Sequence, residues 1–591
     1  MCGRRAMRGP ALPRVKHATL DEALAAAARS SHGLVFVDAT ERETSLSWAQ
    51  VYGRARRTAA GLQRLGVSPG ERVALLLPTS PGFMDAFFGA LLAGAVPVPL
   101  YPPVRLGRLD EYHRSTARML EVSGAAVVLT DAKVRLLLGA SVAAARPRLG
   151  CHTVDEVSRE EGDLVVSVTP EALALIQFSS GSTVDPKPVA LRHGHLMAQL
   201  AALEAELPPA PGQAPVGVSW LPLYHDMGLI GCLLSAVYYP GSMVLLPPEV
   251  FLARPALWLR ALSRHRGFVS PAPNFAYGLC LKRVKDAELE GVDLSAWRYA
   301  LNGAEPVSLE TLRRFTERFS RWGFQAGALR PVYGLSEASL AVTFPPAGRG
   351  PHAVGVDARV LATERRVVDG SREVVSVGRP VPGFEVQVRD GLGQVLPERR
   401  VGRVFVRGPS VMAGYFGLSE ATQRSLDAEG WLDTGDLGFE QDGELFLTGR
   451  AKDVVIIRGA NHAPQEFEEC LETVEGLRTG CAVALGFTPE GEQDEALLIL
   501  AEQAPGAEVE GLEERVREAV VAGTGVRPHT VRVLVPGTLP RTSSGKLRRS
   551  EALRRYLAGE LSAPKKVGTV GLVVEMAKSA LALARAGGHE G

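Results

Sequence analysis

Cysteine and net charge are both scarce in this chain. Its 591 residues include six cysteines, none in a C-x-x-C pair. A disulfide framework is therefore not expected, and a reducing cytoplasm is the predicted location. Lys and Arg total 66 against 65 for Asp and Glu, a formal net charge of +1. Proteins that coat nucleic acid usually carry a strong basic excess, so the charge balance argues against that class.

Long apolar runs are also missing. Leu229–Leu246 is apolar over 18 residues but is broken by Gly231, Ser235 and Pro240-Gly241-Ser242. A buried helix followed by a buried strand explains it better than a membrane span, so we do not expect an integral membrane protein. Residues 1–17 are basic without an apolar segment, unlike a secretory signal. We predict a flexible tail there, with an Arg-rich transit peptide as the alternative.

Glycine is abundant, with 63 residues, and apolar patterning fills most of the chain. From about residue 34 to 306, short strand-like runs alternate with helical patterns, which predicts an α/β body with a mostly parallel sheet. After about residue 375, short strands between Gly-rich turns indicate a β-rich subdomain. A compact α+β unit follows Arg450, and residues 567–586 form a helical tail. Length alone would favour about four domains.

The first polar loop with chemical potential follows a predicted strand that ends at Phe178. Its sequence is Ser179-Ser180-Gly181-Ser182-Thr183-Val184-Asp185-Pro186-Lys187. Hydroxyls and backbone N–H groups in a turn form an anion nest, and a lysine adds a point charge suited to phosphate. Taken alone, an ordinary polar surface loop is an equally good interpretation.

A second loop is Tyr333-Gly334-Leu335-Ser336-Glu337. Its aromatic ring suits stacking on a base, and its carboxylate suits Mg²⁺, a hard cation that also pairs with phosphate oxygens. The alternative is a turn with a solvated glutamate.

Two later loops continue the pattern. Trp431–Asp436, followed by Gly449-Arg450 and Lys452-Asp453, offers a carboxylate able to grip both hydroxyls of a ribose, unless Asp436 only caps a turn. Leu539–Lys546 places a lysine at the tip of a Ser/Gly loop, or else it is an exposed basic loop before a helix over 547–561.

In this order, across about residues 30–560, the four loops resemble the adenylate-forming superfamily of acyl-CoA synthetases, peptide-synthetase adenylation domains and luciferases. The fatty acyl-AMP ligases resemble the chain most. Trp220–Gly231 is similar to the long histidine motif of that branch, and Arg458–Gln465 to its Asn-His-x-Pro-Gln motif. The 41 residues from Glu337 to Gly378 resemble its characteristic insertion, here around 345–375, which is thought to hamper the domain motion that CoA use requires.

The resemblance implies a fold and a reaction. The fold would comprise an N-terminal extension (1–29), an adenylation body of α/β and β-rich subdomains (30–451), a mobile α+β domain (452–562) and a helical tail (563–591). The reaction would use ATP and Mg²⁺ to convert a fatty acid to acyl-AMP and then load the phosphopantetheine thiol of an acyl carrier protein, such as that of a polyketide or peptide synthase. The chain has no evident Asp-Ser-Leu carrier site, so the carrier would be a separate holo protein. A fatty acyl-CoA synthetase is the alternative, and a non-catalytic acyl- or nucleotide-binding homologue is a third hypothesis.

The resemblance also assigns roles residue by residue. A fatty carboxylate is already ionised at pH 7, so positioning and cations, rather than a general base, would carry catalysis. Lys546 would bridge the carboxylate and the α-phosphate, and Glu337, with Thr183, would hold Mg²⁺. His225 would stand between the phosphate site and the acyl tunnel, and Lys452 at the domain hinge. The nucleotide would be held by Ser179, Ser180, Gly181, Ser182, Thr183, Lys187, Gly303, Ala304, Glu305, Tyr333, Gly334, Asp436 and Arg450.

Two sets of residues stay open. Met227, Ile230, Phe275 and Tyr277 are candidates for the acyl wall, although packing in the core explains them equally well. Val184 and Pro188 stand where the family usually has glycine. Valine resists positive φ and proline lacks an N–H donor, so the phosphate loop is expected to be reshaped and ATP turnover slowed.

Overall fold

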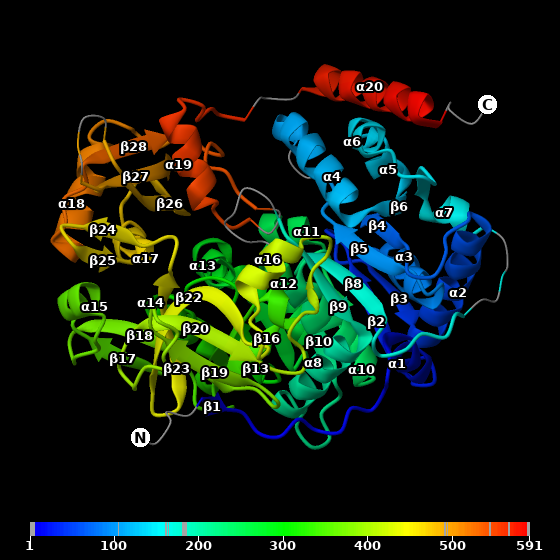
Figure 1. Cartoon of the computed structure of the whole chain (residues 1–591), viewed down its shortest axis with the longest axis horizontal. Helices are drawn as coiled ribbons and strands as arrows, with labels where there is room; N and C mark the ends of the chain where they lie inside the picture. The colour runs from blue at the N-terminus through cyan, green and yellow to red at the C-terminus, as the bar shows by residue number, and fades with distance from the viewer. Residues whose placement is uncertain are drawn as a thin grey trace.

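The predicted mixed α/β fold with a separate C-terminal unit is confirmed (Figure 1). The computed structural model describes residues 6–103, 106–159, 162, 165–179, 186–489, 492, 494–542, 545–564 and 568–587. The hydroxyl residues 180–183 and Val184 of the first loop lie outside this part of the chain. The five cysteines that it includes are free thiols.

Two largely parallel sheets form the first part of the body. One has the order β5-β4-β6-β7, with β4 Arg72–Leu76, β5 Val96–Leu100, β6 Ala125–Thr130 and β7 Cys151–Thr153. The other has the order β14-β13-β12-β10-β11-β2-β3, with only β3 antiparallel to its neighbour. Its strands are β2 Gly33–Val37, β3 Glu43–Ser47, β10 Val216–Ser219, β11 Ser242–Leu245, β12 Val269–Ala272, β13 Tyr299–Asn302 and β14 Leu329–Pro331.

Apolar sequence explains these sheets. All six residues of β6 are buried, as expected of a strand covered on both faces. Helix α3 (Pro81–Leu92) is buried from Phe83 to Leu92, and it begins with Pro81 after a Ser80 side chain that accepts from the Phe83 N–H. The other principal helices here are α1 Leu20–Ala27, α2 Trp48–Arg64, α4 Leu109–Ser123, α6 Gly139–Ala145, α8 His193–Glu206, α12 Ala256–Arg264, α13 Asn274–Arg283 and α14 Leu309–Phe319.

The segment 229–246 is a buried helix and strand, as predicted. Helix α9 (Asp226–Gly228) continues through a π-helical turn at Leu229–Leu234 into α10 (Ser235–Tyr238), and β11 follows in the middle of the seven-stranded sheet. Across the described ranges, no helix is long and apolar enough to cross a membrane.

A β-rich subdomain follows, in agreement with the Gly-rich pattern after residue 375. Its antiparallel sheet has the order β1-β19-β20-β22-β23-β18-β16-β15, with β17 beside β18. The strands are β15 Tyr333–Gly334, β16 Ala341–Phe344, β17 Ala353–Val356, β18 Arg372–Pro380, β19 Glu385–Arg389, β20 Gly402–Arg407, β22 Leu432–Gln441 and β23 Glu444–Arg450. A small sheet, β21-β9-β8, joins the subdomains through β8 Leu173–Phe178, β9 Pro188–Arg192 and β21 Gly414–Tyr415.

The N-terminal segment is not a flexible tail from residue 6 onward, so that prediction was wrong there. Strand β1 (Met7–Arg8) pairs with Glu385 and Val386 of β19, and Met7 is buried. A Cβ on Gly9 would lie 2.2 Å from the Val381 carbonyl oxygen, so the backbones meet closely. A pairing across more than 370 residues leaves no local signal in a basic, proline-containing segment.

The C-terminal unit has its own core, and Figure 1 shows it beside the body. It contains the hairpin β24-β25 (Val455–Ile457, Ala460–His462), the sheet β26-β27-β28 (Leu477–Phe487, Ala496–Gln503, Thr530–Leu534) and the helices α17 Pro464–Glu469, α18 Leu512–Thr524 and α19 Arg549–Leu557. The predicted strands and helices of this unit are present, although α17 ends six residues before the predicted end at Glu475.

The insertion touches the C-terminal unit. It forms β17 and helix α15 (Ala358–Glu364), and it contacts the Asn-His motif. The Asn461 amide donates to the Ala362 carbonyl at 3.2 Å, and Arg365 donates to the Asn461 side chain at 3.3 Å. Arg372 forms an ion pair with Glu466 at 2.6 Å.

The helical tail, α20 (Thr569–Gly587), lies on α6 of the body (Figure 1). Ser579 is buried, and its hydroxyl accepts from the Gly139 N–H at 2.7 Å. Leu583 packs on the core of the four-stranded sheet. The opposite side carries the exposed side chains of Val573, Val574 and Leu581.

We expect Gly139→Ala to release α20, because the added methyl would lie 2.0 Å from the Ser579 carbonyl oxygen. The helix should then exchange its amide hydrogens faster, at a cost of roughly 1–3 kcal/mol in docking free energy. Hydrogen exchange over residues 568–587 checks this. Gly53→Ala is the matched control, since that helical glycine has open space around it and should be neutral or slightly stabilised. Unchanged exchange in the Gly139 variant would contradict the expectation.

Candidate active site

A cavity of about 2130 Å³ lies between the body and the C-terminal unit. Residues of all four polar loops line it, although they are up to 367 positions apart in the chain, from Ser179 to Lys546. The predicted site residues in its lining are Ser179, Lys187, His225, Met227, Phe275, Gly303, Ala304, Glu305, Tyr333, Gly334, Glu337, Asp436, Arg450, Lys452 and Lys546.

Asp436 and Arg450 face each other across two adjacent strands. They are register partners in β22 and β23, and Arg450 Nε lies 3.0 Å from Asp436 Oδ1. The Tyr333 hydroxyl donates to the other carboxylate oxygen at 2.7 Å. Burial and the neighbouring Asp436 raise the pKa of Tyr333 well above its usual value, so this phenol stays protonated. Asp436 raises the pKa of Arg450, which keeps its positive charge.

Close backbone approach explains the glycines beside this pair. A Cβ on Gly334 would lie 1.8 Å from the Leu340 carbonyl oxygen, and a Cβ on Gly303 would lie 2.9 Å from a Val332 methyl. Ala304 follows with φ of 71°, a left-handed conformation that costs a non-glycine residue about 1 kcal/mol or more. The turn brings Glu305 under Phe275, whose N–H donates to the Glu305 carboxylate. Burial raises the pKa of Glu305.

His225 has a buried partner that the sequence patterns did not identify. Its Nδ1 lies 2.6 Å from Asp226 Oδ1, and the Ser336 hydroxyl donates to Asp226 Oδ2 at 2.5 Å. Burial alone would raise the pKa of Asp226, but the His225 imidazole and Ser336 hold it well below its usual range. Asp226 is therefore a fixed negative charge that orients His225 at the cavity wall.

Tyr415 is a second residue that the sequence patterns missed. Its hydroxyl donates to Glu337 Oε1 at 2.9 Å, and Lys187 Nζ lies 4.5 Å from the centre of its ring. It follows Gly414 in β21, which pairs with β9 directly after the first polar loop. Burial raises the pKa of Glu337, and the negative charge of Asp226 adds to this effect.

The lysine loop is a tight hairpin. The Thr542 N–H donates to the Lys546 carbonyl at 2.8 Å, and the Lys546 N–H donates back to the Thr542 hydroxyl at 3.0 Å. Gly545 has φ of 91°, which the turn requires. Burial lowers the pKa of Lys546, whereas the negative charges of Asp226, Glu305 and Asp436 stabilise its ammonium form.

Only the ends of the first polar loop are described. The Ser179 N–H donates to the Lys187 carbonyl at 2.9 Å, which closes the loop at its base. Pro188 is the first residue of β9, opposite Phe178, a position that proline tolerates in a strand. The proline therefore begins the strand that follows the loop. Lys452 follows β23, where the chain leaves the body, and Arg450 and burial lower its pKa.

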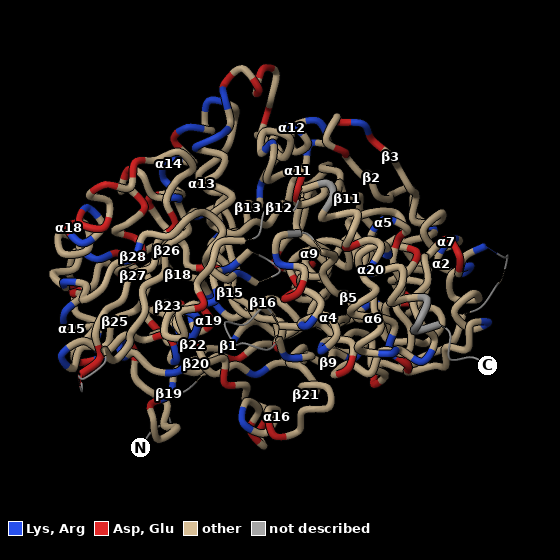
Figure 2. The backbone as a smooth tube through the Cα atoms, turned by 90° about the horizontal axis from the view of Figure 1, so that it is seen from above, with Lys and Arg blue, Asp and Glu red and all other residues tan. Residues whose placement is uncertain are grey.

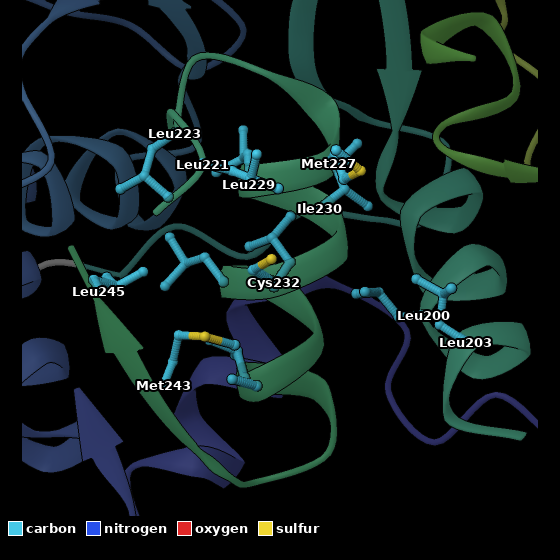
Figure 3. Packing of buried hydrophobic residues seen from close by; sticks show 14 of the residues in the cluster. Leu200, Leu203, Leu221, Leu223, Met227, Leu229, Ile230, Cys232, Met243 and Leu245 are labelled. Carbon is cyan, nitrogen blue, oxygen red and sulfur yellow. The ribbon is translucent and has the colours of Figure 1, made fainter. Parts of the chain in front are cut away.

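The four acyl-wall candidates separate into two pairs. Met227 and Phe275 line the cavity. Ile230 and Tyr277 are absent from its lining and lie fully buried in the core, where Tyr277 packs on Trp258 and Phe315. Figure 3 shows Met227 and Ile230 on the side of their helix that faces Leu200 and Leu203 of α8. Leu203, Leu207, Gly231, Leu340 and Phe344 line the cavity as well.

A comparison with protein families decides the assignment of this cavity. The model of the AMP-binding enzyme family matches residues 24–416. The chain belongs to this adenylate-forming family. Adenylate-forming enzymes use ATP, and the predicted superfamily membership is therefore confirmed.

Relatives of this adenylate-forming chain act on fatty acids according to their names. A Caulobacter vibrioides protein, named provisionally as an acyl-CoA synthetase, is 36% identical over 92% of this chain and 96% of its own. The medium-chain-fatty-acid–[acyl-carrier-protein] ligase of Moorena producens is 34% identical, over 89% and 92%. A long-chain-fatty-acid–AMP ligase of Mycolicibacterium smegmatis is 34% identical, over 90% and 92%.

Solved structures agree with this assignment. A chain from a study of fatty acyl-adenylate ligases of E. coli and L. pneumophila superposes with a TM-score of 0.87 at 35% identity, over 93% of this chain and 99% of its own. An L. pneumophila fatty acyl-adenylate ligase in complex with acyl adenylate and pyrophosphate gives 0.70 at 30% identity, over 92% and 96%.

Proposed function

We propose that this adenylate-forming enzyme is a fatty acyl-AMP ligase that loads a separate holo acyl carrier protein. The observation that carries the proposal is the convergence of Lys546, Glu337 and the Asp436–Arg450 pair on one cavity whose wall also includes apolar residues. Cations suit the triphosphate, and the Asp436–Arg450 pair suits the ribose. The apolar wall, with Met227 and Phe275, suits an alkyl chain.

The first step would join two anions. A carboxylate oxygen of the fatty acid attacks the α-phosphorus of ATP, the bond to the β-phosphate oxygen breaks, and pyrophosphate leaves. The Lys546 ammonium would contact both the carboxylate and the α-phosphate, which offsets their repulsion. Arg450, held by Asp436, would contribute a second fixed cation. In the second step a thiol attacks the acyl carbon, a thioester forms, AMP leaves and the thiol proton passes to solvent.

The residues around Glu337 fit Mg²⁺. Magnesium usually takes one or two carboxylates and completes its coordination with water and phosphate oxygens, so a large protein cage is not required. Glu337 lies near the charge of Asp226, and its raised pKa reflects the absence of a nearby compensating cation. We assign Glu337, with Thr183, to hold the ion, which would supply charge neutralisation at the phosphates when bound.

Tyr415→Phe should weaken the Mg²⁺ response, because Glu337 loses the hydroxyl that orients it at 2.9 Å. A hydrogen bond to a charged group is worth about 1.5–3 kcal/mol, so we expect at least about a 10-fold rise in the Mg²⁺ concentration for half-maximal ATP–pyrophosphate exchange. A magnesium titration of the exchange rate measures it. Tyr239→Phe, at an exposed site, is the control, and an unchanged titration of the Tyr415 variant would refute the orienting role.

The contacts of the insertion favour a carrier over CoA. The insertion binds the C-terminal unit through Asn461 and Glu466, which opposes a rearrangement of that unit. The printed names of two relatives, an acyl-carrier-protein ligase and a fatty-acid–AMP ligase, point to the same reaction. We place the reaction in the cytoplasm, where free thiols persist.

The test is incubation of the protein with a panel of fatty acids, ATP and Mg²⁺, followed by detection of acyl-AMP and pyrophosphate. Acyl-AMP should form in the absence of any thiol. Formation of neither product with any fatty acid would reject the enzyme and favour a non-catalytic acyl- or nucleotide-binding protein. The name of the Caulobacter relative supports the second candidate, a fatty acyl-CoA synthetase, which efficient acyl-CoA production would establish.

A further inference from the structure

The C-terminal unit is bound to the body at one turn of helix α4, away from the insertion. Arg108, directly before α4, and Glu111, in its first turn, are three residues apart and form an ion pair at 3.5 Å. Both side chains line the large cavity at its rim. Neither belongs to any of the four motif loops.

Arg108 binds the chain just before the lysine hairpin. Its guanidinium donates at 3.1 Å to three backbone carbonyls of the C-terminal part, those of Gly537, Thr538 and Ser562. The Arg108 side chain is only 18% exposed. Three acceptors on one guanidinium fix both the position and the orientation of residues 537–538, because the fork of N–H groups is planar and rigid.

Glu111 binds the chain just after the hairpin. Its carboxylate accepts from Arg555 of α19 at 2.6 Å, and Arg555 also contacts Glu551 of its own helix at 2.6 Å. Burial alone would raise the pKa of Glu111, but the hydrogen bond and charge of Arg555 hold it below its usual value. The pair is therefore ionised at neutral pH and partly screened from water, where ion pairs are stronger than on the open surface.

The two contacts flank Lys546. Only Leu539 separates Thr538 from the hairpin, and α19 begins at Arg549, three residues after Lys546. The hairpin is closed by the Arg548 N–H, which donates to the Pro540 carbonyl at 2.9 Å. A short rigid hairpin fixed at both ends to α4 has little freedom at its tip.

We propose that Arg108, Glu111 and Arg555 form a latch that positions the Lys546 hairpin for acyl-AMP formation. The latch residues are positioning residues: they act through Lys546. This inference rests on the proposed function. It predicts that the adenylation step needs the latch and that thioester formation from ready-made acyl-AMP does not, because Lys546 has no role in that second step.

The test compares Arg555→Ala with Arg554→Ala. The two arginines are adjacent on α19 and both contact Glu551, but Arg554 binds only Glu551 and Glu560 of its own unit. We expect Arg555→Ala and Arg108→Ala to lower kcat of ATP–pyrophosphate exchange by about 10- to 100-fold, the scale of a misplacement of about 1 Å, with KM for ATP nearly unchanged. Arg554→Ala should be within about twofold of wild type.

A second measurement separates positioning from loss of fold. Transfer from isolated acyl-AMP to a holo carrier should stay within about threefold of wild type in the Arg108 and Arg555 variants, and Arg555→Lys should recover part of the exchange rate. Equal losses in exchange and transfer, or equal effects of Arg554 and Arg555, would overturn the latch. Wild-type protein without any exchange would instead reject the proposed function, so the two failures are distinguishable.

Discussion

Lys546→Ala is expected to lower the rate of ATP–pyrophosphate exchange by about 1,000-fold, about 4 kcal/mol at 1.36 kcal/mol per decade. The loss is large because the lysine would meet charge that develops as carboxylate and phosphate approach, in a site partly closed to water. Asp226, Glu305 and Asp436 act on its ammonium, and no other lysine occupies the hairpin. Radioactive pyrophosphate exchange under saturating ATP and fatty acid measures the effect.

The control for this variant is Lys578→Ala, which removes an exposed lysine that pairs only with Glu575 on α20. It should exchange at the wild-type rate. Lys546→Arg should recover less than a tenth of the activity, since the guanidinium keeps the charge but is wider and differently shaped. Exchange by the alanine variant within threefold of wild type would remove Lys546 from the reaction.

Asp436→Asn should raise KM for ATP by roughly 30- to 100-fold, with a smaller fall in kcat. The amide keeps the size of the side chain but removes the charge that Arg450 contacts at 3.0 Å and the acceptor for the Tyr333 hydroxyl at 2.7 Å. The loss of the partner of a buried cation costs about 3–5 kcal/mol, and part of this should appear as weaker nucleotide binding.

Steady-state kinetics with varied ATP distinguish this effect from a general loss of stability. Asp442→Asn is the matched control, because Asp442 lies in the turn of the same hairpin with φ of 55°, which asparagine tolerates. A KM for ATP in the Asp436 variant equal to that of the control would contradict the ribose-binding role.

The sequence was informative where chemistry and local structure coincide. Asp436 and Arg450 were predicted as a pair, and they are direct partners across the β22-β23 hairpin. The lysine loop and the Tyr333 loop were recognised because their glycines and polar residues stand close together in the chain. Alternation of strands and helices predicted the parallel sheets, since each short apolar run is buried on both faces.

Contacts between distant segments could not be predicted. The partner of Asp226 is Ser336, and the partner of Glu337 is Tyr415, which are 110 and 78 positions away. The latch joins Glu111 to Arg555 across 444 positions. Such pairs depend on how subdomains pack, and neither periodicity nor a short motif encodes that packing.

Apolar residues near a motif were also ambiguous. Met227 and Ile230 are three positions apart on one helix, yet only Met227 lines the cavity. Figure 2 shows the same limit for charge: Lys and Arg alternate with Asp and Glu over the surface, so the near-zero total conceals the few cations that line the site.

The most direct measurement of the central claim is a competition for the acyl group. Wild-type protein with fatty acid, ATP and Mg²⁺ receives equal concentrations of holo acyl carrier protein and CoA, and both thioesters are quantified by mass spectrometry. We predict acyl carrier in large excess over acyl-CoA, with acyl-AMP as the only product when both thiols are absent. Acyl-CoA as the main thioester would contradict the carrier-loading account.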